Sequence, residues 1–423
     1  MRKKFFNVRG TSDFKPSETL VFQDINQKSR DICQKFGYEE ISLPILEERE
    51  LFLKGVGEVT DIVERQMFKI EGKDIVLRPE GTAQVIRYYL QNSLFKQNDF
   101  YKFFYQGPMF RGERPQKGRL RQFHHIGVEA IGSNSIYIDA EIISLCFEIL
   151  KDIGVTEKEL KINTLGCISD KEKFSYTLKQ SLSGKRDELC EDCAKRLEKN
   201  PLRVIDCKNK QCKNVVNSLN LEMGHLCLDC KTRFNDLLSL LKDMNIKHVY
   251  SPHLVRGLDY YTNTVFEITS NKLGSQDAIG AGGRYNNLMK SLGGPEIPAI
   301  GFALGVERIL LILAETQRSK TLDFFVAVTG QDNTKLGFGI LRDIREAGFS
   351  ADFDYKDKSL KGQLRVAQKK GTKFVLILGE EEHKNDSFVL RNMETSTQEI
   401  IKYNNLTTEI KKRMKSLGIE KVI

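Results

Sequence analysis

The sequence predicts an α+β protein in which an antiparallel sheet carries an inserted helical subdomain and precedes a small α/β domain. Three observations support this. Before Thr321, strand-like runs are interspersed with helices without regular alternation, and a Lys-rich helical stretch interrupts them. After Thr321, strands and helices alternate regularly. The chain also has 423 residues, which is too many for one ordinary domain.

Most of the strands predicted in the core lie in the first third of the chain. Ser17 to Phe36 has a helical apolar rhythm that ends at Gly37, and Glu40 to Ile45 then reads as a strand. Because Pro44 lacks a ladder donor, that strand should lie at an edge or an interface. Further predicted strands are Phe100 to Phe110, Gln122 to Gly132 and Val265 to Ile268, the first two joined by Gly112 to Arg121.

Two composition shifts divide the chain. Ser169 to Asn245 is Lys-rich and helical and holds six of the nine cysteines. We therefore expect a core over residues 1–322 with a helical insertion at about 169–245, followed by a domain over 323–423. The predicted elements of that domain are strands at Phe324–Val328, Ala351–Tyr355 and Phe374–Leu378 and helices at Thr334–Ala347 and Ser359–Lys369.

The composition indicates the cellular compartment of the protein and the kind of partner it binds. The net charge is +9, from 66 Lys+Arg against 57 Asp+Glu, which favours a polyanionic partner without requiring one. No run reaches the ~18 apolar residues of a membrane span. The basic N-terminus has no apolar segment behind it, and the nine Cys are an odd number, so we expect a cytoplasmic protein with thiols or metal ligands rather than disulfides.

One segment is rich in basic residues. Between Arg111 and Arg121 there are five basic residues and one acid, with Gly and Pro that cannot continue a strand. Several guanidinium groups converging from a loop suit a triphosphate, and the ring of Phe123 could stack on a purine. The alternative is a solvated basic hairpin tip.

A second segment, Ala303 to Leu313, places Gly305 before a helix that is apolar almost all round and hence predicted to be buried. Arg308 lies in the first turn of this helix. A buried guanidinium is costly unless an anion meets it. That anion is either a ligand or an internal carboxylate such as Glu307.

Together these segments resemble motifs 2 and 3 of class II aminoacyl-tRNA synthetases, and Gly37 to Glu47 with Pro44 resembles motif 1, the dimer interface of that class. Four further segments resemble the histidyl-tRNA synthetase family: Leu254 to Tyr261, Ala281 to Leu288, Arg78 to Thr82 and Arg9 to Phe14. The resemblance covers essentially the whole chain. It implies a homodimeric enzyme that activates L-histidine with ATP, accompanied by Mg²⁺, and transfers it to tRNA(His).

The resemblance also implies roles for individual residues. Arg111 and Arg256 would contact the α-phosphate and act in catalysis. The histidine site would comprise Glu80, Thr82, Arg111, His125, Glu129, Arg256, Tyr260 and Tyr261, with Glu129 and Tyr261 at the imidazole. The ATP site would comprise Arg111, Glu113, Arg119, Phe123 and Arg308. Arg114 and Gln116 would meet the acceptor end of the tRNA, where the family reads an extra 5′ guanosine, and residues 323–423 would read the anticodon.

His125 departs from the family pattern, because the family usually has Gln there. An imidazole offers one donor or one acceptor in similar reach, so the contact with bound histidine can survive.

The cysteines leave a question open. Cys190-x2-Cys193 and Cys227-x2-Cys230 have knuckle spacing, with Cys207, Cys212 and His225 between them. One interpretation is a structural zinc site with four thiolates, and the other is six reduced thiols. Relatives carry the insertion without this Cys set, so we assign no metal ligand from the sequence.

Two other classes of protein share part of this pattern. A histidine-sensing regulatory paralogue of ATP phosphoribosyltransferase resembles this core, but such proteins lack the C-terminal domain and lose catalytic signature residues, whereas Arg256 and Arg308 are present here. A generic RNA-binding protein would not need the amino-acid signatures.

Overall fold

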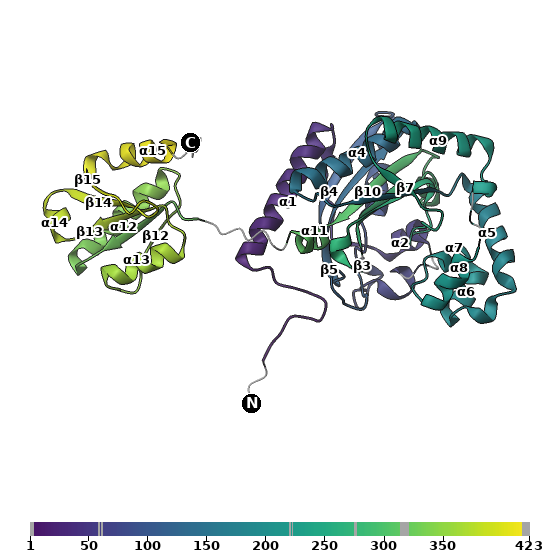
Figure 1. Cartoon of the computed structure of the whole chain (residues 1–423), viewed down its shortest axis with the longest axis horizontal. Helices are drawn as coiled ribbons and strands as arrows, with labels where there is room; N and C mark the ends of the chain where they lie inside the picture. The colour runs from purple at the N-terminus through teal and green to yellow at the C-terminus, as the bar shows by residue number, and fades with distance from the viewer. Residues whose placement is uncertain are drawn as a thin grey trace. The chain divides into compact units, whose positions relative to one another are not determined.

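A computed structural model describes residues 4–57, 60, 62–219, 221, 223–274, 277–313 and 321–416. The chain forms two compact units, Met1–Thr316 and Gln317–Ile423, which are described separately (Figure 1).

The larger unit is built on an eight-stranded sheet with the order β1-β4-β5-β10-β9-β8-β6-β7. Its strands are β1 (Glu39–Glu40), β4 (Tyr101–Phe110), β5 (Gln122–Ile131), β6 (Glu159–Thr164), β7 (His248–Tyr250), β8 (Thr262–Thr269), β9 (Ala278–Arg284) and β10 (Ala299–Gly305). The inner pairs are antiparallel, and only the outer pairs β1–β4 and β6–β7 are parallel. The predicted α+β class is therefore confirmed.

Helices cover one face of this sheet. They are α1 (Pro16–Lys35), α4 (Ile136–Ile153), α9 (Leu228–Asp243) and α11 (Val306–Ile312). Since side chains alternate across a strand, Ile126 and Val128 of β5 pack into this helix layer, while Phe123 and His125 point to the opposite face. Only the first half of α11 is buried, so the prediction of a helix buried all round is wrong for its second half.

The strand predicted over Glu40 to Ile45 is interrupted. Only β1 and, further on, β2 (Leu46–Glu48), which pairs with β3 (Ile75–Leu77), are strands. Between them the Ile41 N–H donates to the Phe104 carbonyl at 2.9 Å. Further along, the carbonyls of Leu43 and Pro44 accept from the side chains of Arg78 and Gln84, each at 2.9 Å. Two helices pack nearby, α2 (Arg49–Val56) and α3 (Thr82–Gln91), and the short α10 (Leu288–Ser291) contacts both.

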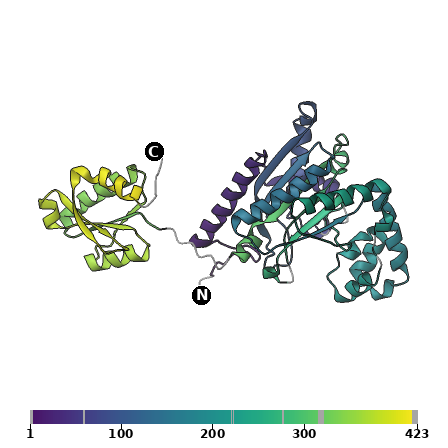
Figure 2. The ribbon, with the colours of Figure 1, turned by 45° about the horizontal axis from the view of Figure 1, so that its top comes forward.

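The Lys-rich stretch is helical, as predicted. It contains α5 (Ile168–Ser183), α6 (Glu191–Lys199), α7 (Leu202–Ile205) and α8 (Lys210–Asn217), and α9 leads the chain back to the sheet. Figure 2 shows the teal helices of this insertion gathered at one end of the sheet.

The smaller unit has a five-stranded sheet of order β12-β11-β13-β14-β15. The three predicted strands are present as β11 (Phe324–Val328), β12 (Ala351–Phe353) and β13 (Phe374–Leu378), all parallel, and the predicted helices as α12 (Thr334–Glu346) and α13 (Leu360–Lys369). The prediction omitted the antiparallel pair β14 (Ser387–Asn392) and β15 (Gln398–Lys402), and helices α14 (Glu380–Lys384) and α15 (Leu406–Ser416).

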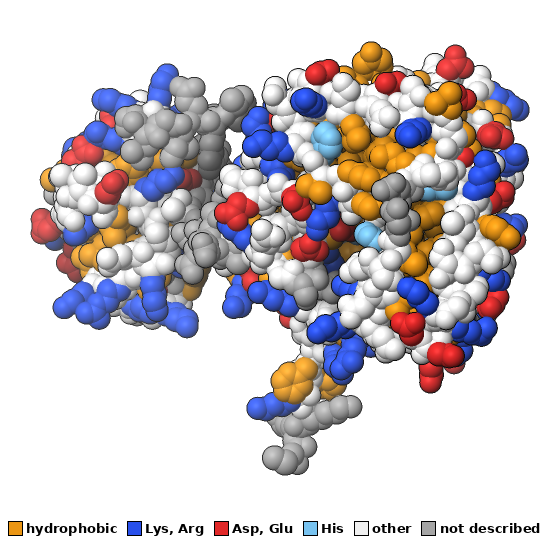
Figure 3. Space-filling model, turned by 45° about the vertical axis from the view of Figure 1, so that its right-hand side comes forward, with side chains coloured by type: hydrophobic (Ala, Val, Ile, Leu, Met, Phe, Trp, Pro, Cys, Tyr) orange, Lys and Arg blue, Asp and Glu red, His pale blue; other side chains and the backbone are white. Residues whose placement is uncertain are grey.

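Across the described residues, every helix is too short or too polar to cross a membrane. On the face of the larger unit seen in Figure 3, hydrophobic side chains gather at the centre and Lys, Arg, Asp and Glu side chains surround them.

Candidate active site

A cavity of about 540 Å³ is lined by strands of the large sheet and by a segment of the insertion. Eleven of the predicted site residues line it: Glu80, Thr82, Arg111, Glu113, Arg119, Phe123, His125, Arg256, Tyr260, Tyr261 and Arg308. Glu129 does not line the cavity but lies buried behind its wall. Arg114 and Gln116 lie outside the cavity lining, and both are exposed on the loop between β4 and β5.

Glu80 places a buried carboxylate at the start of α3. Its oxygens accept hydrogen bonds from the backbone N–H groups of Thr82 (2.6 Å) and Ala83 (3.1 Å). Burial raises the pKa of Glu80 even though these hydrogen bonds favour the charged form. A carboxylate fixed this way suits an ammonium group brought by a ligand, because the incoming cation would offset the cost of burial.

Glu129 lies beneath the cavity on β5. It accepts hydrogen bonds from the hydroxyl of Thr82 (2.7 Å) and from the hydroxyl of Tyr285. Burial raises its pKa to about 8, against the effect of both hydrogen bonds. Gly301 on the neighbouring strand makes room for it, since a Cβ at that position would lie 1.8 Å from Glu129 Oε2.

Three tyrosines form an aromatic wall. The ring centroids of Tyr260 and Tyr261 are 4.7 Å apart, and those of Tyr260 and Tyr285 are 5.7 Å apart. Lys171 of α5 holds this segment from behind by donating to the carbonyls of Asp259 (2.5 Å) and Tyr261 (3.0 Å). These tyrosines therefore pack in the core and line the cavity at the same time.

The cationic side of the cavity begins with Arg111. Its Nε donates to the Pro79 carbonyl at 2.8 Å, and its guanidinium lies 5.2 Å from the centroid of the Phe123 ring. Burial lowers the pKa of Arg111. Glu113 forms an ion pair with Arg119, with Oε2 3.1 Å from Nη1, and so keeps a second guanidinium beside the first.

Arg308 extends this cationic surface from the first turn of α11. It donates to the carbonyls of Gly118 (3.1 Å) and Ala278 rather than to a carboxylate in the described part of the chain. Glu307, the alternative partner, instead accepts from the backbone N–H of His124 at 2.8 Å. Burial, and then repulsion by Arg119, lower the pKa of Arg308. Such a guanidinium is poised for an anionic ligand.

Arg256 approaches from the side of β8. Its Nη1 lies 2.7 Å from Oε2 of Glu267, which also lines the cavity. Although burial disfavours its charge, the pKa of Arg256 is raised, mainly by the Glu267 carboxylate. Arg256 is therefore a fixed cation.

His125 is a neutral imidazole. Burial, followed by the charge of Arg111, holds its pKa well below the usual range. Its ring makes an edge contact with Phe123 at 5.0 Å, and Nδ1 has no hydrogen-bond partner among the residues that the structure describes. One donor or acceptor is therefore available to a ligand.

The structure also adds lining residues that sequence reasoning missed. Asp206 and Lys208 of the insertion line the cavity, and the pKa of Lys208 is lowered by burial and then by Arg119. Glu267 and Tyr285 line the cavity as well. In the sequence, Tyr285 could be identified as a site residue only from its place in a family signature. The charge pattern of the insertion did not identify Asp206 or Lys208.

An antiparallel sheet with this strand order and an arginine-rich, nucleotide-sized cavity defines a class II aminoacyl-tRNA synthetase core. Residues 10–309 match the family model described as histidyl-tRNA synthetase, and residues 323–413 match the model of an anticodon binding domain. The chain belongs to the histidyl-tRNA synthetase family.

Relatives agree over nearly the full length. The chain is 44% identical over 411 residues to the histidine–tRNA ligase of Halothermothrix orenii, covering 96% of this chain and 98% of that one. It is 42% identical over 414 residues to that of Clostridioides difficile, covering 96% and 99%. Among solved structures, the apo histidyl-tRNA synthetase of S. aureus matches with a TM-score of 0.80 and 31% identity, over 96% of this chain and 100% of that one.

Proposed function

We propose that this protein is a histidine–tRNA ligase. It activates L-histidine with ATP to form histidyl-adenylate and pyrophosphate, and then transfers histidine to the 3′ end of tRNA(His). One observation carries the proposal: a single cavity joins a carboxylate-and-tyrosine pocket to a cluster of four arginines. An amino acid and a triphosphate can therefore bind with their reacting groups together.

The first step needs positioning and charge neutralisation rather than a protein nucleophile. A carboxylate oxygen of histidine attacks the α-phosphorus, and the bond from that phosphorus to the β-bridging oxygen breaks to release pyrophosphate. Arg111 and Arg256 neutralise the charge that develops on the α-phosphoryl oxygens. Arg119 and Arg308 hold the β- and γ-phosphates, and Mg²⁺ enters with ATP as part of the substrate.

The adenine moiety occupies the cavity beside the basic loop. Phe123 offers a ring face for stacking, and Glu113 lies within reach of the adenine edge. Because Glu113 already orders Arg119, a change at Glu113 affects both the base and the phosphates. His125 lies between these groups and the histidine pocket and contributes its unpaired ring nitrogen to the bound amino acid.

Specificity for histidine arises from groups that require polar partners. Glu80 and Thr82 receive the ammonium, with Tyr260 beside them. Tyr261 meets one imidazole nitrogen at the cavity wall. Glu129, which lies behind that wall and accepts from the hydroxyls of Thr82 and Tyr285, is assigned to the other. An apolar amino acid would leave these buried groups unpaired, which costs roughly 1–3 kcal/mol each.

In the second step a hydroxyl of the terminal tRNA ribose attacks the adenylate carbonyl, AMP leaves, and a phosphate oxygen of the adenylate takes the hydroxyl proton. We place the extra 5′ guanosine of the acceptor stem against Arg114 and Gln116, whose side chains are exposed and lie outside the cavity lining. Residues 1–322 are the catalytic core, with the insertion at about 169–245 bracing the acceptor arm. Residues 323–423 read the anticodon.

We also propose an isologous homodimer through the motif 1 region. Ile45 and Leu46, next to Pro44, remain 42% and 52% exposed in the isolated chain. Apolar side chains beside an interrupted sheet edge suit an interface. We expect the enzyme to act in the cytoplasm, where translation consumes its product.

The test is ATP–pyrophosphate exchange with each of the twenty amino acids. The proposal predicts exchange that depends on histidine alone. A histidine-binding regulatory paralogue would bind histidine without exchange, and an RNA-binding protein would do neither. Absence of histidine-dependent exchange in folded protein would refute the proposed function.

A further inference from the structure

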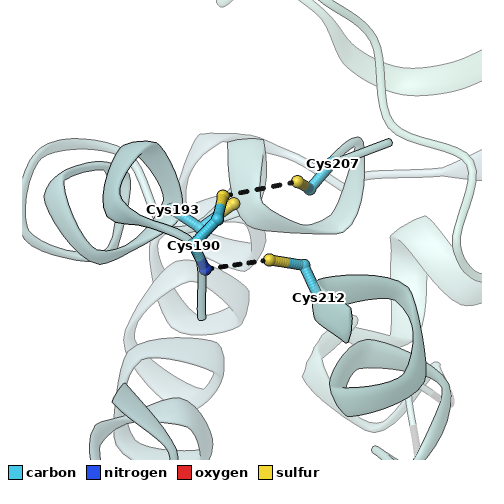
Figure 4. A group of neighbouring side chains, drawn as sticks. All are labelled: Cys190, Cys193, Cys207 and Cys212. Atoms are coloured by element: carbon cyan, nitrogen blue, oxygen red, sulfur yellow. Dashed lines mark hydrogen bonds between the residues drawn. The ribbon is translucent and has the colours of Figure 1, made fainter. Parts of the chain in front are cut away.

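The insertion gathers four cysteines from separate segments. The Sγ atoms of Cys190, Cys193, Cys207 and Cys212 all lie within 4.8 Å of one another, and those of Cys190 and Cys207 are 3.9 Å apart (Figure 4). All four are free thiols. Four thiolates around one zinc ion, at about 2.3 Å each in a tetrahedron, are about 3.8 Å from one another. The spacing therefore suits one ion.

Local structure holds these sulfurs toward a common point. Cys190 is the N-cap of α6 and Cys193 lies in the first turn of that helix, while Cys212 lies in the first turn of α8. The backbone N–H of Cys190 donates to Cys212 Sγ at 3.2 Å, and that of Asn209 donates to Cys207 Sγ at 3.4 Å. Hydrogen bonds from the backbone orient ligands and stabilise thiolate charge.

A second group lies where the insertion joins the sheet. Cys167, Asp170, Cys227 and Cys230 bring three sulfurs and a carboxylate oxygen within 4.8 Å of one another. Cys167 is the N-cap of α5 and Cys227 the N-cap of α9. The backbone N–H of Cys227 donates to Asp170 Oδ1 at 3.0 Å, and that of Cys167 donates to Cys230 Sγ at 3.2 Å.

Asp170 adds a carboxylate to the three thiols of this second group. Its side chain is fully buried, and Oδ2 has no hydrogen-bond partner among the described residues. A buried carboxylate oxygen without a partner is costly, whereas a bound cation turns the same oxygen into a ligand. Cys33 and Cys146 show the contrast: both are fully buried among apolar side chains, and neither belongs to such a donor group in the described part of the chain.

We propose that the insertion binds two zinc ions. The first is held by Cys190, Cys193, Cys207 and Cys212. The second is held by the thiolates of Cys167, Cys227 and Cys230 with the Asp170 carboxylate. Tetrahedral sites rich in thiolate select zinc or iron–sulfur clusters, and the carboxylate ligand favours zinc. The two knuckles thus belong to different sites, which corrects the sequence-based interpretation of one four-thiolate site.

Each ion braces a wall of the cavity. Cys207 lines the cavity together with its neighbours Asp206 and Lys208, so the first ion fixes the insertion segment that faces the arginines. Asp170 precedes Lys171, which holds the carbonyls of Asp259 and Tyr261, so the second ion fixes the segment of the histidine pocket. Only this link to the cavity rests on the proposed function; the metal sites themselves do not.

The test is the metal content of the full chain purified without chelator and dialysed against dilute zinc. We expect two zinc ions per chain by plasma mass spectrometry and by native mass spectrometry. Cys212→Ser and Cys230→Ser should each retain one ion, and the matched control Cys146→Ser should retain two. Cobalt substitution should give a four-thiolate spectrum in Cys230→Ser and a spectrum with fewer sulfur ligands in Cys212→Ser.

Three results would overturn the proposal: fewer than two zinc ions in wild type, iron in place of zinc after loading, or loss of the same single ion in both variants. The wild-type count needs no variant to fold, so it decides even if a serine variant aggregates. Removal of zinc from wild type should also lower its Tm and expose thiols to titration. Because these readouts do not involve adenylation, they separate failure of the metal sites from failure of the ligase function.

Discussion

Replacing Arg256 by alanine tests the catalytic centre, because two effects follow from one substitution. The guanidinium that we place on the α-phosphate is lost, which lowers the rate of adenylate formation about 10²- to 10³-fold for one preorganised electrostatic contact. The Glu267 carboxylate, 2.7 Å from Arg256, is also uncovered inside the cavity. At about 5 Å from phosphate in an effective dielectric of about 20, its repulsion costs ~3 kcal/mol, or about a further 10²-fold.

Arg256→Ala should therefore slow single-turnover adenylation by about 10⁴-fold or more, while the Kd for histidine changes much less. The double variant Arg256→Ala/Glu267→Gln lacks both charges and should be the faster of the two, at about 10²- to 10³-fold below wild type. Arg413→Ala is the matched control, since Arg413 forms an Arg–Glu pair with Glu399 at 2.6 Å in the smaller unit, outside the cavity lining.

Rapid quench of enzyme, histidine and α-labelled ATP gives the rates directly. A rate for Arg256→Ala within tenfold of wild type would remove Arg256 from the chemical step. If the double variant were no faster than the single one, the Glu267 carboxylate would not repel the phosphate in Arg256→Ala. The placement of the α-phosphate beside Arg256 would then be wrong.

The remaining predictions concern the pocket, its titration, the loop and the assembly. Glu129→Ala should raise the KM for histidine far more than the KM for ATP, and changes within twofold for both would contradict the pocket assignment. The pKa of Glu129 is about 8 in the folded chain and 4.5 ordinarily, so wild type loses stability as pH rises through that window. Glu129→Gln should escape this loss, and its advantage in urea unfolding without ligand should grow from pH 5 to pH 8.5, to at most about 5 kcal/mol; a pH-independent difference would count against the raised pKa. Arg114→Ala/Gln116→Ala should reduce tRNA charging while sparing exchange, and equal losses would assign the loop to ATP alone. Light scattering at micromolar concentration should show a dimer, and a stable active monomer would contradict the motif 1 interface.

The sequence predicted best where a local pattern determines the element. β4 and β5 are long runs whose alternate residues face a helix layer and a cavity, and both were placed within a residue of their ends. The strand predicted after β1 is interrupted where two carbonyls, those of Leu43 and Pro44, accept from distant side chains, and no local period encodes such partners. The pair β14–β15 was omitted because the regular α/β alternation of the preceding elements ends before it.

The site residues also divide into those that the sequence predicted and those that only the structure identifies. Family motifs identified the arginines and tyrosines that the fold brings together around the cavity. They did not show that Arg308 donates hydrogen bonds to backbone carbonyls, or that Asp206 and Lys208 of the insertion line the cavity. The two cysteine groups could be recognised only in the fold. The Cys-x2-Cys spacing identifies pairs in the sequence, but it does not show which other residues lie beside each pair.

The central claim is that this chain transfers histidine to tRNA(His), and the measurement that tests it most directly is kcat/KM for charging tRNA(His) transcripts with labelled histidine. We expect ATP-dependent charging of the intact transcript, a large loss when the extra 5′ guanosine is deleted, and a smaller loss when the anticodon is exchanged. Histidine-dependent exchange without any charging of tRNA(His) would contradict the claim. An anticodon exchange costlier than the guanosine deletion would contradict the placement of the acceptor end at the basic loop.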